Sequence, residues 1–114
     1  MATKTVTKGN LLRSNEVCAS PVAATTFSSG DTVKIPADDK NLVILIQPSA
    51  TGNIVISKGN GYAGVADLTL AVTADKDNWV QLDTSAFGNV SGANKGFIIM
   101  TPALAGSLSL INAL

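Results

Sequence analysis

Short runs of β-branched and aliphatic residues, each stopped by proline, glycine or a cluster of Asp, Asn and Ser, divide the chain from end to end. The clearest run, Leu42 to Gln47, is apolar on both alternating faces and is followed by Pro48. A continuous aliphatic run of this length fits a central strand that is covered on both sides. No stretch keeps a helical period over more than two turns. The pattern therefore predicts a fold built from sheets.

The remaining runs complete this prediction. They are Thr32–Ile35, Gly52–Ser57, Leu68–Thr73, Trp79–Leu82, Gly96–Met100 and Ser107–Ile111. In the third and fourth runs apolar and polar residues alternate, which places Leu68, Leu70 and Val72 toward the core and favours a hairpin between these two strands. The spacing of the runs, about ten to eighteen residues, is typical of a sandwich or small barrel. We expect an all-β chain that folds as a small single-domain antiparallel β-sandwich or a barrel-like fold.

The first fifteen residues differ from the rest, because they have no sustained period of either two or 3.6. We expect an extended N-terminal arm or edge segment over residues 1–15 and a β domain over residues 16–114. The arm can add to a sheet edge or lie in a groove of a partner. Its candidate contact residues are Thr3, Lys4, Thr5, Val6, Thr7, Leu11 and Leu12. Deleting Thr3 to Leu12 should then abolish attachment and leave the domain folded.

Composition argues against several classes of function. The 114 residues contain no histidine, which removes Ser-His-Asp and Cys-His nucleophile pairs and His-containing zinc sites. Eight basic and eight acidic residues give a formal charge of zero, so we expect no binding to nucleic acid or to an acidic membrane surface. We therefore expect that the protein is not an enzyme and that it binds neither a cofactor nor a metal ion. Only 14% of residues are charged and 46% are hydrophobic, which leaves apolar surface for a partner.

Two motifs resemble ligand sites. Gly59 to Gly64 is a literal G-x-G-x-x-G, but the following segment alternates with period two where a dinucleotide site needs a helix, so it is interpreted as a mobile glycine-rich loop. Asp75 to Asn78 lacks the glycine and terminal glutamate of a calcium loop and is interpreted as a turn. Tyr62 at the loop tip and Trp79, on the polar face of its strand, are the candidate exposed contacts.

The segment Asn78 to Pro102 resembles small structural proteins of tailed bacteriophages. Three segments are similar to those of capsid decoration (cement) and head-fibre base proteins. They are the segment Leu-Asp-Thr-Ser-Ala-Phe, the connection Val-Ser-Gly-Ala-Asn-Lys-Gly and the closing strand Ser-Leu-Ser-Leu-Ile. The resemblance implies a virion structural protein without catalytic residues. It would be synthesised in the host bacterial cytoplasm and bind the outer capsid surface, where it bridges or stabilises subunits of the major capsid protein. It also implies a homo-oligomer, with a trimer favoured.

A second function stays open at this point. A β-sandwich with Tyr62, Trp79 and loops rich in Asn and Asp could be a glycan-binding or adhesion module on a virion or cell surface. The two hypotheses differ in what the protein binds, a capsid in the first and a glycan in the second. Replacing Tyr62 or Trp79 should abolish glycan binding in the one case, and removing the arm should abolish capsid binding in the other.

Overall fold

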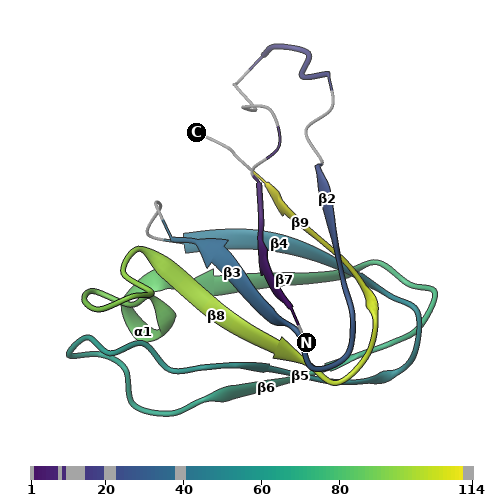
Figure 1. The fold of residues 1–114 in the computed structure, drawn as a ribbon. Helices are drawn as coiled ribbons and strands as arrows, with labels where there is room; N and C mark the ends of the chain where they lie inside the picture. The colour runs from purple at the N-terminus through teal and green to yellow at the C-terminus, as the bar shows by residue number, and fades with distance from the viewer. Residues whose placement is uncertain (1, 8, 10–14, 20–22, 38–40, 112–114) are drawn as a thin grey trace.

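The computed structural model describes residues 2–7, 9, 15–19, 23–37 and 41–111 (Figure 1). These residues form nine strands and one short helix. The elements are β1 (Thr3–Thr5), β2 (Ala24–Phe27), β3 (Thr32–Pro36), β4 (Asn41–Pro48), β5 (Gly52–Ile56), β6 (Leu68–Val72), β7 (Asn78–Asp83), α1 (Thr84–Phe87), β8 (Phe97–Pro102) and β9 (Gly106–Ile111). No described helix has the length and apolar character needed to cross a membrane.

The strands form two sheets that pack face to face, which confirms the predicted all-β sandwich. One sheet has the order β1-β3-β8-β5-β6 and the other the order β2-β9-β4-β7. All pairings are antiparallel except that of β1 with β3, which is parallel. Apart from β5 and β6, neighbouring strands are not consecutive in the sequence, so most of the pairing joins residues far apart in the chain.

The core lies between the two sheets and is made of the side chains that point inward from their strands. Its fully enclosed side chains are Val33, Ile35, Ile44, Ile46, Ile54, Ile56, Ile98, Met100, Leu108 and Leu110. The predicted inward positions Leu68, Leu70 and Val72 do face this core. The isolated aromatic Phe87, in α1, also packs against it. Period-two alternation thus determined which face each strand buries.

The prediction that β4 is covered on both faces is wrong at Val43. This side chain keeps 38% of its surface exposed, whereas its inward neighbours Leu42 and Ile44 are buried. The reason is that only one face of each sheet meets the other sheet, so the outer face of β4 meets solvent at Val43. Leu45, on the same outer face, is nevertheless 6% exposed.

The predicted hairpin between Leu68–Thr73 and Trp79–Leu82 is also wrong. β6 ends the five-stranded sheet beside β5, and β7 ends the four-stranded sheet beside β4. The connection between them passes from one sheet to the other. The side chain of Asn78 holds this crossing: its Oδ1 accepts from Thr73 N at 3.1 Å, and its Nδ2 donates to Thr73 O and to Lys76 O at 3.0 Å each.

Candidate functional site

The predicted partner-binding residues at the N-terminus divide into exposed and buried ones. Thr3, Thr5 and Thr7 are exposed, Lys4 is half-buried, and Val6 belongs to the core with 2% of its surface exposed. Leu11 and Leu12 lie outside the described residues. A partner can therefore reach the three threonines but not the side chain of Val6.

Backbone hydrogen bonds hold this segment in the sandwich. Thr32 N donates to Ala2 O at 2.8 Å, and Val6 N donates to Lys34 O at 2.9 Å. Further along, Gly9 N donates to Leu110 O at 3.1 Å, in the opposite sheet. The segment thus joins both sheets as an edge strand, and β1 lies against β2. Its removal is expected to destabilise the domain, which revises the expectation that the fold would be left intact.

Asp31 is the side chain that fixes the start of β1. Its carboxylate accepts a hydrogen bond from Ala2 N at 3.0 Å and another from Ser28 N at 2.9 Å. These two bonds, the one from Ala2 first, lower the pKa of Asp31 below its usual 3.8, and the positive charge of Lys4 adds to the effect. The side chain is only 4% exposed. Asp31 therefore links the N-terminal strand to the turn that precedes β3.

Contrary to the mobile loop expected from its glycines, the G-x-G-x-x-G loop between β5 and β6 is held by contacts with α1 and with the segment that follows α1. Gly59 N donates to Ala86 O at 2.9 Å, and a Cβ built on Gly59 would lie 2.2 Å from Gly88 O. Asn60 makes two bonds to the same segment: its Nδ2 donates to Ser91 O at 2.9 Å and its Oδ1 accepts from Val90 N at 2.8 Å. The first glycine is thus required for close backbone packing.

The last glycine of the motif is required for the same reason. A Cβ on Gly64 would lie 2.0 Å from Gly59 O, and Gly64 N closes a turn by donating to Gly61 O at 3.1 Å. The chain then continues into β6 and not into a helix. The motif therefore lacks the helix N-terminus on which dinucleotide binding depends.

Three exposed apolar side chains lie on these two braced segments, and we call them the loop-end surface: Tyr62, Val65 and Val90. Their exposed fractions are 107%, 83% and 62%. Val90 lies beside Gly61, the residue that precedes Tyr62, because a Cβ on Gly61 would come within 3.3 Å of its side chain. The predicted contact residue Tyr62 is therefore exposed on a loop that hydrogen bonds join to the segment carrying Val90.

Trp79 is the other predicted contact residue, and the structure does not bring it close to Tyr62. Trp79 lies near the start of β7, on the outer face of the sheet, opposite Leu45 on β4, and is 58% exposed. The length of β6 separates the loop that carries Tyr62 from the crossing that precedes Trp79, and five strand residues span roughly 16 Å. A single glycan site that uses both aromatic rings is not formed.

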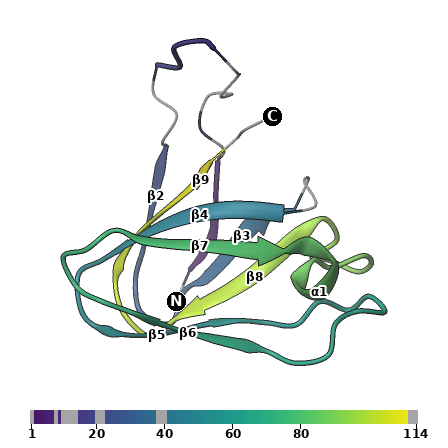
Figure 2. The same cartoon turned by 180° about the vertical axis from the view of Figure 1, so that it is seen from behind.

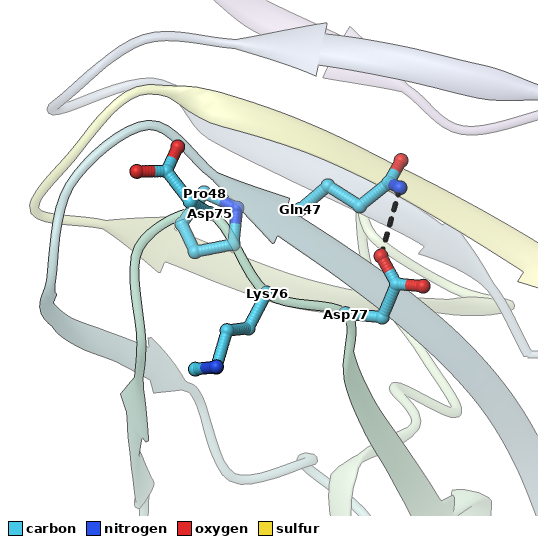
Figure 3. A pocket seen from close by; sticks show the side chains of 5 residues that line it. All are labelled: Gln47, Pro48, Asp75, Lys76 and Asp77. Atoms are coloured by element: carbon cyan, nitrogen blue, oxygen red, sulfur yellow. Dashed lines mark hydrogen bonds between the residues drawn. The ribbon is translucent and has the colours of Figure 1, made fainter.

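The acidic turn before β7 lines an open hollow of about 320 Å³, together with Gln47 and Pro48 (Figure 3). Gln47 Nε2 donates to Asp77 Oδ1 at 3.0 Å, while the side chains of Asp75 and Lys76 point away from this pair. Within the described part of the chain, no three His, Cys, Asp or Glu side chains are close enough to hold a metal ion. The segment is a turn, as its residues predicted.

Sequence reasoning missed Asp31, Asn60 and Asn78. Each had the appearance of an ordinary turn residue, because Asp and Asn are common in turns for local reasons. Asp31 and Asn60 bond to Ala2 and Ser91, about thirty residues away. Asn78 makes local bonds to Thr73 and Lys76 and a further bond to Ile46 O, at a similar distance in the sequence. A glycine-rich loop interrupted by one Asn is the only signal in the sequence that could have drawn attention to Asn60.

Comparisons with known proteins add no assignment to this geometry. No protein-family model matches the chain, and neither the curated proteins nor the solved structures contain a match.

Proposed function

We propose that this chain is a non-enzymatic structural protein of a bacteriophage virion, which binds the outer surface of the capsid and bridges subunits of the major capsid protein. The loop-end surface is the observation that carries the proposal. Tyr62, Val65 and Val90 are each exposed on two adjoining segments, and hydrogen bonds from Asn60 and Gly59 join these segments.

A fixed apolar surface suits protein binding. Tyrosine is enriched among the residues that contribute most to protein interfaces, since it buries a large area and loses little side-chain freedom. A loop already held in one conformation also loses less entropy when it binds. The loop-end surface therefore has the chemistry of a contact with another protein.

The exposed threonines of the N-terminal segment provide a second contact. Thr3 and Thr5 lie on β1, which ends its sheet, and Thr7 follows. Their hydroxyl groups can hydrogen bond to a neighbouring subunit without adding charge. Two separate contact regions on one small domain are what bridging requires, and a repeating lattice multiplies modest affinities.

The test is co-sedimentation with heads of the phage that encodes the chain. Wild-type protein is expected to bind at a fixed, saturable ratio to the major capsid protein. Tyr62→Ala should weaken binding by about tenfold or more, as expected for an aromatic anchor. Tyr62→Phe keeps the ring and is the matched control, which should stay near wild type if packing carries the contact.

Two results would contradict the proposal. Folded protein that does not sediment with heads would overturn capsid binding. Specific binding on a glycan array that is lost in Trp79→Ala, with none to heads, would establish the adhesion module instead.

A further inference from the structure

The side of the sandwich formed by β6 and β7 has two unpaired sheet edges. Among the described strands, β6 pairs only with β5 and β7 only with β4. β1 and β2, at the other ends of the two sheets, lie against each other. β6 and β7 therefore lie on the opposite side of the sandwich, and Figure 2 shows β7 above β6.

Neither edge carries the residues that usually protect one. β6 and β7 read LTLAV and NWVQLD, so that Asp83 is the one charged residue and neither strand contains lysine or proline. Proteins commonly blunt exposed edges with such residues, because unpaired backbone groups otherwise recruit another strand. Two unprotected edges on one side indicate that a partner adds its strands there.

An incompletely buried strip runs between these edges. Leu68, Leu70 and Val80 face inward and pack against the core, yet they are only half-buried. Ile54 and Ile98, in the central strands, are fully enclosed. The core is thus open to water along this side, and a strand added at either edge would cover it.

We propose that a second copy of this chain covers this side, with β6 of each copy adding to β7 of the other. β6 and β7 run in opposite directions in the fold (Figures 1 and 2). A two-fold axis parallel to the strands therefore sets β6 of one copy antiparallel to β7 of the other at both junctions. All four edges are then paired, so the assembly closes at two copies.

The side chains match across such a junction. Thr69 and Ala71 face outward from β6, and Trp79 and Gln81 face outward from β7. In a continuous sheet, side chains on the same face become neighbours, so these polar and apolar groups meet without a charge among them. The chain's zero net charge adds no long-range repulsion between copies. This inference does not depend on the proposed capsid function.

Native mass measurement over a range of concentrations tests the proposal. Wild-type protein is expected to be a dimer. Thr69→Lys combined with Gln81→Lys places like charges at both junctions and should weaken dimerisation by at least about tenfold. Thr69→Glu combined with Gln81→Lys places opposite charges there and should keep the dimer.

The matched control places the same two charges elsewhere. Thr26→Lys combined with Thr101→Lys changes exposed residues of β2 and β8 and should leave the mass unchanged. Circular dichroism and thermal melting confirm that each variant is folded before its mass is interpreted.

Three outcomes would overturn the proposal. A monomeric wild type at every concentration would exclude the contact. An oligomer that resists the like charges but dissociates in the control would place the contact on another face. A trimer, as the phage resemblance implies, would overturn the two-fold arrangement even if the like charges dissociated it.

Discussion

On one side of the sandwich the N-terminal segment joins the two sheets, whereas on the other side β6 and β7 leave their edges unpaired within the described chain. The joined side is held by backbone bonds of Ala2, Val6 and Gly9 to β3 and β9 and by the carboxylate of Asp31. The open side has none of these. Both sides belong to one core, so the difference shows where the fold is complete by itself and where it can accept a partner.

The largest expected effect comes from opening the joined side. Val6→Asp buries a carboxylate in the core with no partner, and we expect it to lower the free energy of unfolding by about 4 kcal/mol. Thr5→Asp changes the exposed neighbour and should stay within about 0.5 kcal/mol of wild type. Urea unfolding measures both. Equal losses in the two variants would mean that the segment does not pack as an edge strand.

A smaller effect is expected from Asp31. Asp31→Ala removes the acceptor for Ala2 N and Ser28 N and should destabilise the domain at neutral pH, with faster amide exchange at Val6 and Thr32. The measurement is urea unfolding between neutral pH and acid, with hydrogen exchange of the β1 and β3 amides.

The pH dependence of this effect has a definite sign. Because the folded pKa of Asp31 lies below 3.8, its stabilising contribution is present above that pH and is lost as the pH falls through the lower folded value. The difference between wild type and Asp31→Ala should therefore shrink in strong acid. A difference that grows on acidification would contradict the assignment.

On the open side, side-chain truncation should leave the fold nearly unchanged and act on association. Trp79→Ala removes a side chain that is 58% exposed, so we expect the free energy of unfolding of the monomer to fall by about 0.5 to 1 kcal/mol. The same change removes the largest apolar group from the proposed contact, so the dimer should dissociate. Sedimentation and urea unfolding of the same sample separate these effects. If Trp79→Ala strongly destabilised the fold but left the dimer mass unchanged, Trp79 would support the fold and not the contact between copies.

The smallest effect is expected between the two sides, on β9. The hydroxyl of Ser109 is buried and has no hydrogen-bond partner among the described residues. Ser109→Ala removes this group, so we expect the free energy of unfolding to change by less than about 0.5 kcal/mol and toward higher stability. Thermal melting measures it. A clear loss of stability would mean that the hydroxyl has a partner in solution.

The sequence predicted β3 to β9 because runs of apolar residues and alternation with period two are local properties. It could not predict which strands pair. Leu68–Val72 and Asn78–Asp83 alternate in the same way whether they form a hairpin or lie in different sheets. The distinguishing feature is their five-residue connection, longer than the two-residue loops of most hairpins and held by Asn78.

The candidate site was predicted in part. Exposure of Tyr62 and Trp79 followed from a loop tip and from a polar strand face, both of which are local properties. Their separation was not predictable, because it depends on which sheet each strand joins. β1 was missed as a strand because three residues are too short to show a period, and Val6 enters the core only through pairing with β3.

The position of Trp79 has a practical consequence. It is the only tryptophan in the chain, and more than half of its surface meets solvent on the open side. Its indole emission therefore reports on the polarity of this one location, without a label. Whatever covers β7 should move that emission to shorter wavelength, while binding confined to the loop at Tyr62 should leave it unchanged.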